Sequence, residues 1–123
     1  MMKRISQAEL DVMEALWQKS PMAASDVARR LEDKNWNIRT VKTLLSRLVE
    51  KDVISTQQDG RRYLYSPLVT KSDYARRAAR RLSDRLFGGR AAPLVAHLAA
   101  GEGLSSQDIA ELEALLQELK NER

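Results

Sequence analysis

The chain has 123 residues, a hydrophobic fraction of 43% and a net charge of +4, which suits one ordinary domain or a small domain with an appendage. It contains no cysteine and a single histidine, so disulfides and thiolate metal sites are excluded and little remains for a histidine-based catalytic relay. No apolar run approaches the length of a membrane span and the N-terminus has no signal-peptide pattern, so we expect a cytoplasmic protein.

The first fifty residues predict three short helices. Ser6–Glu9 is a capping box, and the helix that it opens runs to about Lys19. A second helix is expected over roughly residues 24–33, and Asn37 can act as the N-cap of a third. Three helices of which the middle one is short are typical of a helix-turn-helix domain.

The third helix divides into an apolar face and a cationic face. The apolar residues follow one another at helical spacing: Val41, Leu44, Leu45 and Leu48. The opposite face and its flanks carry Arg39, Thr40, Lys42, Thr43, Ser46 and Arg47, with no acid before Glu50. These side-chain types reach base edges and phosphates in a major groove. Taken alone, the pattern also fits an ordinary amphipathic helix with a solvated face.

A β-hairpin is predicted directly after this helix. Residues 53–57 and 62–66 are β-prone, and Asp59-Gly60 between them predicts a type I′ turn. A helix followed by a hairpin with a basic tip is the order of a winged helix-turn-helix. Arg61 and Arg62 are then expected on the wing, where they would hold phosphates beside the groove.

Four aromatic residues are assigned to the packing of this domain. Trp17 and Trp36 are interpreted as core residues rather than as platforms on which bases stack. Tyr63 and Tyr65 alternate with Leu64, so the two tyrosines share one strand face, which is expected to pack on the helices.

Three more helices are predicted in the second half of the chain. Thr70 and Asp73 can cap the first in the manner of a capping box, and Gly88-Gly89 ends it. A short apolar helix covers about residues 92–100, and the last helix begins at Ser105.

The predicted elements and the charge distribution define two domains. Residues 71–90 carry a net charge of +5 and residues 91–123 a net charge of −4. We expect a mainly α fold with a small β-hairpin. It would comprise a winged-helix DNA-binding domain over residues 1–69 and a three-helix dimerisation domain over residues 70–123.

The C-terminal helices carry broad aliphatic stripes but too few residues to enclose a core. Their leucines therefore need a partner, and a second copy of the chain would cover more of them than packing onto the winged helix. The residues expected at the dimer interface are Leu82, Leu86, Leu94, Ile109, Leu112, Leu115, Leu116 and Leu119.

Over nearly its whole length the chain resembles the penicillinase-repressor family of the BlaI/MecI type. In the first domain the matching residues are Ile5–Glu9, Val12-Met13, Trp17, Trp36, Thr40–Leu44 and Arg47-Leu48. After the wing they are Tyr63–Val69, Gly88-Gly89, Leu94-Val95, Leu104-Ser105 and Ile109–Leu112. The order and spacing of these motifs carry the resemblance, rather than any one of them.

The resemblance implies a winged-helix repressor that acts as a homodimer on a dyad operator of double-stranded DNA, controlling β-lactamase-type resistance or related genes. By position it assigns DNA contacts to Asn37, Arg39, Thr40, Lys42, Thr43, Arg47, Arg61 and Arg62. It also implies a membrane-bound sensor metallopeptidase whose signal leads to cleavage of the dimerisation domain. Relatives that are cleaved tend to carry Asn-Phe where this chain has His97-Leu98, the corresponding candidate cleavage position.

Other functions are weighed against this one. A winged helix used only for protein contact is disfavoured by the donor-rich third helix beside a basic wing, and a ligand-responsive repressor stays open. Catalysis is not expected, because no constellation of catalytic residues and no Gly-rich phosphate loop is present. No cofactor or metal is expected, and the C-terminus lacks the paired Cys-x-Cys elements of copper-responsive relatives.

Overall fold

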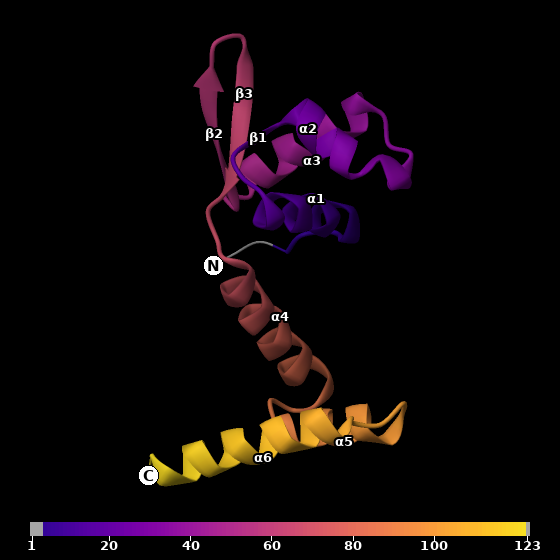
Figure 1. Cartoon of the computed structure of the whole chain (residues 1–123), viewed down its shortest axis with the longest axis vertical. Helices are drawn as coiled ribbons and strands as arrows, with labels where there is room; N and C mark the ends of the chain where they lie inside the picture. The colour runs from indigo at the N-terminus through magenta and orange to yellow at the C-terminus, as the bar shows by residue number, and fades with distance from the viewer. Residues whose placement is uncertain (1–3, 123) are drawn as a thin grey trace. The chain divides into compact units, whose positions relative to one another are not determined.

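The computed structural model describes residues 4–122. The elements, in chain order, are α1 (Gln7–Gln18), β1 (Met22–Ala23), α2 (Ala24–Arg30), a 3-10 turn η1 (Glu32–Lys34), α3 (Ile38–Glu50), β2 (Ile54–Asp59), β3 (Arg62–Pro67), α4 (Lys71–Leu86), α5 (Ala91–Ala100) and α6 (Ser106–Asn121) (Figure 1). The chain divides into two compact units between Arg76 and Arg77, inside α4. The mainly α fold with a small β-hairpin is confirmed.

The predicted helix starts are confirmed where a side chain caps them. Ser6 and Glu9 form both bonds of the capping box of α1. The Asn37 side-chain oxygen accepts a 2.8 Å hydrogen bond from the Thr40 backbone N–H at the start of α3. The second helix is shorter than expected, because α2 ends at Arg30. The turn η1 follows it, and Asn35, the residue after η1, adopts the left-handed conformation.

The hairpin is part of a three-stranded antiparallel sheet in the order β1-β3-β2. Strand β1, which the sequence analysis missed, has only two residues and pairs Met22 with Tyr65. The predicted type I′ turn is wrong. Asp59 pairs with Arg62, so Gly60 and Arg61 form the loop, and of these only Gly60 has positive φ (+65°), as in a type II′ turn.

The core of the first unit lies among α1, α2, α3 and the base of the sheet. All four predicted apolar residues of α3 are buried in it, together with residues of α1, α2 and β2. Trp17 and Trp36 are partly buried against this core, as is Tyr65. Tyr63 is 52% exposed, so the expectation that both tyrosines pack on the helices is wrong. Figure 1 shows the reason: the β2–β3 hairpin extends beyond the helices, and Tyr63 lies in its outer half.

Three contacts attach the start of α4 and the segment just before it to α1. The Trp17 indole N–H donates a 2.9 Å bond to the Val69 carbonyl, and the Trp17 ring packs against Tyr74 with centroids 5.7 Å apart. The Lys71 ammonium lies 2.9 Å from a Glu14 carboxylate oxygen. The first unit accordingly includes the first turn of α4, up to Arg76.

The start of α4 carries half of the expected capping box. Thr70 Oγ1 accepts a 3.0 Å bond from the Asp73 N–H. The Asp73 carboxylate does not return a bond to Thr70; it accepts one from Arg76 at 3.1 Å instead. The Thr70 cap is confirmed, and the reciprocal bond is absent among the described residues.

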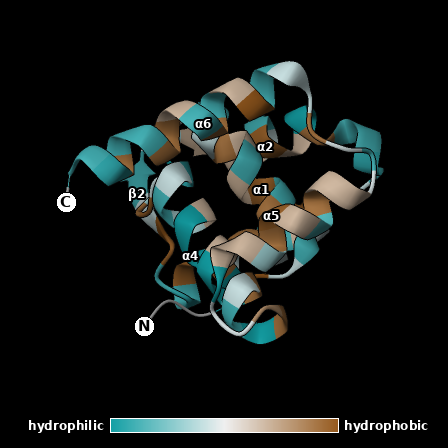
Figure 2. Ribbon diagram, turned by 90° about the horizontal axis from the view of Figure 1, so that it is seen from below, coloured by the Kyte–Doolittle hydropathy of each residue, from teal (hydrophilic) through white to brown (hydrophobic). Residues whose placement is uncertain are grey.

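The second unit consists of the rest of α4, α5 and α6. Gly88 and Gly89 end α4 with positive φ, and the Gly89 N–H bonds to the Ser83 carbonyl. Ser105 and Asp108 form a complete capping box on α6. Figure 2 shows α5 coloured mostly as hydrophobic and α6 carrying both hydrophobic and hydrophilic residues. Across residues 4–122 no helix is long and apolar enough to cross a membrane.

Candidate nucleic-acid interface

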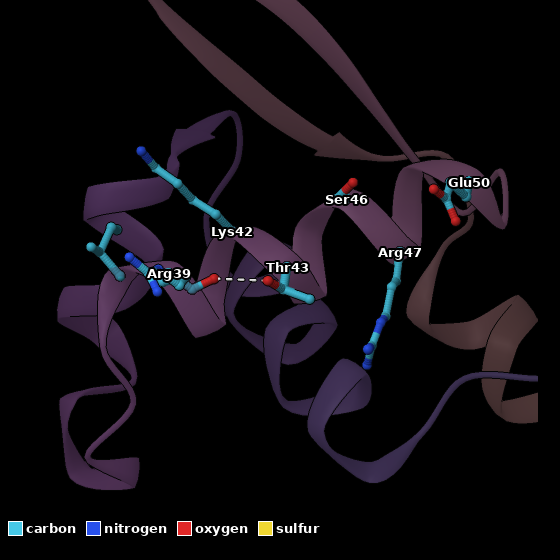
Figure 3. Close-up of a pocket in the computed structure, with 7 residues that line it drawn as sticks. Arg39, Lys42, Thr43, Ser46, Arg47 and Glu50 are labelled. Atoms are coloured by element: carbon cyan, nitrogen blue, oxygen red, sulfur yellow. Dashed lines mark hydrogen bonds between the residues drawn. The ribbon is translucent and has the colours of Figure 1, made fainter.

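The exposed side of α3 is the strongest candidate site in the first unit. It borders an open hollow of about 610 Å³ lined by Ile38, Arg39, Lys42, Thr43, Ser46, Arg47 and Glu50. In Figure 3 the labelled side chains all leave this helix on its outer side, with Lys42 and Arg47 directed away from each other. The buried apolar residues at helical spacing anchor the opposite face, so this orientation follows from the amphipathic pattern of the helix.

One hydrogen bond on this face restricts what a side chain can offer. Thr43 Oγ1 donates a 3.0 Å bond to the Arg39 carbonyl one turn earlier (Figure 3). The hydroxyl hydrogen is thereby used, so Thr43 presents its methyl group and the oxygen lone pairs outward. The Arg39 guanidinium keeps all five N–H donors, which suits bidentate contact with a guanine edge.

The positive charge of this face is not neutralised within the chain. Arg39, Lys42 and Arg47 are exposed and take part in none of the ion pairs formed among residues 4–122. Cations without internal carboxylate partners on a convex helix are positioned to bind phosphates and bases. The single acid of the face, Glu50, lies in the last turn of the helix.

The wing adds a second, smaller basic region. Arg61 is exposed in the turn, and it forms no ion pair within the part of the chain that the structure describes. Arg62 Nε lies 3.4 Å from an Asp59 carboxylate oxygen across the same turn, so part of its charge is already compensated. The two arginines, which sequence reasoning treated alike, therefore differ in their environments.

An ion pair that the sequence analysis did not identify joins the ends of α1 and α3. Glu9 is 2% exposed, and its Oε1 accepts 2.7 Å bonds from the Ser6 N–H and the Lys51 ammonium. Burial alone would raise the pKa of Glu9, but the bonds from Lys51 and Ser6 outweigh it and hold that pKa below its ordinary value. This contact links the C-terminal end of α3 to α1.

The predicted DNA-contact residues fall in two groups. Those of α3 lie together at its exposed side and N-terminal end, except that Thr40 is half-buried on the flank and Asn37 is engaged in capping. Arg61 and Arg62 lie on the hairpin. Sequence reasoning missed Ile38, which is 43% exposed although its spacing from Val41 suggests the apolar face. Its position as the first helical residue is the signal that could have identified it, since no earlier turn covers it.

The residues assigned to the second domain lie in the second unit and are largely uncovered. Six of the expected dimer residues are 44–65% exposed, and Leu94 and Leu112 are half-buried. The candidate cleavage residues lie within α5, where Leu98 is 59% exposed. The exposed His97 ring packs edge-on against Phe87 with centroids 5.1 Å apart, and its Nδ1 lies 3.2 Å from the Pro93 carbonyl oxygen.

Two known proteins are similar to this chain over almost its whole length. The penicillinase repressor of Bacillus licheniformis is 31% identical over 121 residues, covering 98% of this chain and 94% of the relative. The methicillin resistance regulatory protein MecI of Staphylococcus aureus (strain N315) is 30% identical over 113 residues, covering 91% of this chain and 92% of the relative.

A solved structure resembles 60% of the chain. Bacillus licheniformis BlaI, in its monomeric form in complex with the blaP half-operator, matches with a TM-score of 0.52 and 33% identity, covering 60% of this chain and 92% of that one. The winged-helix fold is thereby confirmed. The penicillinase repressor family model matches residues 5–118. With this match across both units, the chain is a member of the penicillinase repressor family.

Proposed function

We propose that this protein is a sequence-specific transcriptional repressor that occludes a promoter by binding an operator in double-stranded DNA. The observation that carries this proposal is the exposed face of α3, where Arg39, Lys42 and Arg47 have no carboxylate partner within residues 4–122. The face lies opposite four buried apolar residues and belongs to the same unit as the basic wing turn. On this proposal the protein acts in the cytoplasm, where a bacterial operator lies.

In the proposed complex, the residues of α3 read bases in the major groove. Arg39 and Thr43 contact base edges, with Asn37, Thr40 and Arg47 beside them, while Lys42 and the wing residues Arg61 and Arg62 hold phosphates. The family relative bound to a half-operator supports this docking, because its DNA complex was solved for a protein of the same fold.

The repressor is further proposed to act as a homodimer. The exposed leucines of α4 and α6 supply an apolar surface that a second copy would cover. A two-fold dimer places two recognition helices about 34–36 Å apart, on successive major grooves of a dyad operator. The family and its relative MecI point to antibiotic-resistance genes as the regulated class.

The direct test is operator binding on the protein's own promoter. Fluorescence anisotropy with labelled promoter fragments, in the presence of excess unrelated DNA, should reveal one fragment bound with a dissociation constant of about 10⁻⁸–10⁻¹¹ M, as is typical of specific complexes. Inverting one half-site should weaken operator binding. Moving one half-site by half a helical turn should prevent a dimer from contacting both half-sites at once. Equal binding on all fragments would contradict sequence-specific repression, and no binding to any fragment would favour a protein-contact module.

Relief of repression is proposed to involve proteolysis at His97-Leu98 following a signal from a membrane-bound sensor metallopeptidase. The supporting observation is that Leu98 is exposed in a helix of the second unit, where cleavage would divide the leucine-bearing segments. Co-expression with a neighbouring gene for such a sensor, followed by mass spectrometry of the induced repressor, tests this step. Release from DNA with the chain intact would favour a ligand-responsive repressor instead.

A further inference from the structure

The second unit leaves a large part of its apolar surface uncovered. Leu82 and Leu86 of α4 are 44% and 65% exposed, and Leu115, Leu116 and Leu119 of α6 are 49%, 55% and 50% exposed. Exposed leucines that recur along two helices indicate a surface that another molecule covers. These leucines form one apolar stripe on α4 and one on α6. The charged residues that flank each stripe indicate which partner covers it.

The edge of the α4 stripe is basic. Arg77, Arg81 and Arg85 follow one another at intervals of four residues, so they form a single row along the helix, next to Ala78 and Leu82. None of these three arginines forms an ion pair within residues 4–122, whereas Arg76, on another side of the helix, is paired with Asp73 at 3.1 Å. The row is therefore a cationic edge without an internal counter-charge.

The edge of the α6 stripe is acidic. Glu111, Glu118 and Glu122 are separated by seven and four residues, which places them in one row beside Leu115. All three are exposed, and none is paired with a cation in the described part of the chain; Glu111 accepts only a 3.2 Å bond from Gln107. Glu113 and Lys120 lie along the other edge of the stripe.

We propose that in the homodimer the basic edge of α4 in one copy lies against the acidic edge of α6 in the second copy. This inference deepens the dimer of the proposed function and rests on it. In a two-fold dimer each contact occurs twice, so two opposite-sign edges on one chain satisfy each other reciprocally. The arrangement corresponds to the charged positions that flank an apolar seam in coiled coils and select partner and orientation. DNA does not suit the pair of edges, because the acidic row would repel phosphates.

The test uses two charge-reversal variants of the full-length protein. In one, Arg77→Glu and Arg85→Glu reverse the basic edge; in the other, Glu111→Lys and Glu118→Lys reverse the acidic edge. Each variant alone would place like charges together at both symmetric contacts. Sedimentation equilibrium at low salt should show the dimer dissociation constant rising by about tenfold or more in each.

Mixing the two variants provides the decisive measurement. In a heterodimer of the two, both contacts regain opposite signs, so native mass spectrometry, which separates the species by mass, should show the heterodimer in large excess over either homodimer. A chain that carries all four substitutions should dimerise like the wild type. If α4 and α6 were paired within one chain, mixing would give no heterodimer preference, and that result would overturn the proposal.

Matched controls separate the edges from net charge. Arg76→Glu with Arg80→Glu changes the charge of α4 by the same amount away from the row, and Glu113→Lys changes the other edge of α6; neither should affect dimerisation beyond about twofold. Circular dichroism checks that each variant keeps its helices. A wild-type protein that is monomeric at micromolar concentration contradicts the proposed dimer itself. A wild-type dimer that all variants share contradicts only the pairing of the edges.

Discussion

The ammonium of Lys51, directly after α3, lies 2.7 Å from Oε1 of Glu9, which is also the capping-box glutamate of α1. One buried carboxylate therefore caps the start of α1 and holds the end of α3. Its second oxygen, Oε2, is buried without a hydrogen-bond partner among the described residues. This pair is the most buried ion pair among residues 4–122, and a buried carboxylate depends strongly on its few partners.

Removing the ammonium should destabilise the protein. We expect Lys51→Met to lower the free energy of unfolding by about 1–3 kcal/mol, because Glu9 would remain buried with only its bonds to Ser6. Lys71→Met is the matched control: it breaks an ion pair of 2.9 Å whose side chains are 63% and 39% exposed, and should cost less than about 1 kcal/mol. Urea denaturation at fixed protein concentration measures both, and equal losses would contradict the importance assigned to burial.

The pH dependence of stability should report the same carboxylate. Since folding lowers the pKa of Glu9 below its ordinary value of 4.5, the charged form stabilises the native state. That contribution is complete above the unfolded-state pKa and is lost as the pH falls through the folded-state pKa. The stability difference between wild type and Glu9→Gln should therefore be largest near neutral pH and shrink on acidification below about pH 4.5. A difference that does not change between pH 7 and pH 3 would rule out this assignment.

Substitutions in α3 should show which side-chain groups determine sequence preference, and whether the Thr43 hydroxyl is one of them. Arg39→Ala should reduce discrimination at one base pair by about 1–3 kcal/mol. Because the Thr43 hydroxyl already donates to the Arg39 carbonyl, Thr43→Val should keep sequence preference, whereas Thr43→Ser, which removes the outward methyl, should relax it. Competition between operator and single-base variants measures both effects. The docking face would be wrong if Arg39→Ala and Thr43→Ser left sequence preference intact.

The two wing arginines should differ in their contribution to phosphate binding. Arg61→Ala should weaken binding to all sequences and reduce the slope of log K against log salt by about 0.9, as expected for one phosphate contact. Arg62→Ala should reduce this slope less, because Asp59 already compensates part of the Arg62 charge. Salt titrations of operator binding test this, with Asp59→Asn expected to strengthen binding. Equal slopes for the two alanine variants would show that the Arg62 pair opens on DNA.

Asn37 should affect folding and DNA binding separately. Asn37→Ala removes the cap of α3 and should cost about 1 kcal/mol of stability. Asn37→Asp keeps a capping oxygen, so stability should be retained, while the added negative charge beside the phosphates should weaken operator binding. Thermal unfolding and anisotropy on the same samples compare the two. If Asn37→Asp binds the operator as tightly as wild type, Asn37 lies away from the phosphates.

Local patterns in the sequence were sufficient for most of the helices. Helix starts were predicted correctly at Ser6, Asn37 and Ser105. The apolar spacing of α3 also predicted its exposed cationic face correctly. Both succeeded because capping and amphipathicity act within a few residues. The hairpin was also predicted, although its turn was assigned one residue too early. Asp-Gly favours a hairpin, but the strand register, which depends on pairing along the full length of β2 and β3, placed Gly60-Arg61 in the loop.

Contacts between distant segments were decided only by the tertiary structure. The sequence contains Glu9 and Lys51 forty-two positions apart, and nothing local indicates that they form a buried pair. The same holds for the pairing of Met22 with Tyr65 and for the Trp17 bond to Val69, just before α4. Sequence by itself determined which faces of the helices are apolar or cationic, since periodicity is a local property. Which charges are compensated depends on the packing of segments far apart in the chain, and only the folded structure decides that.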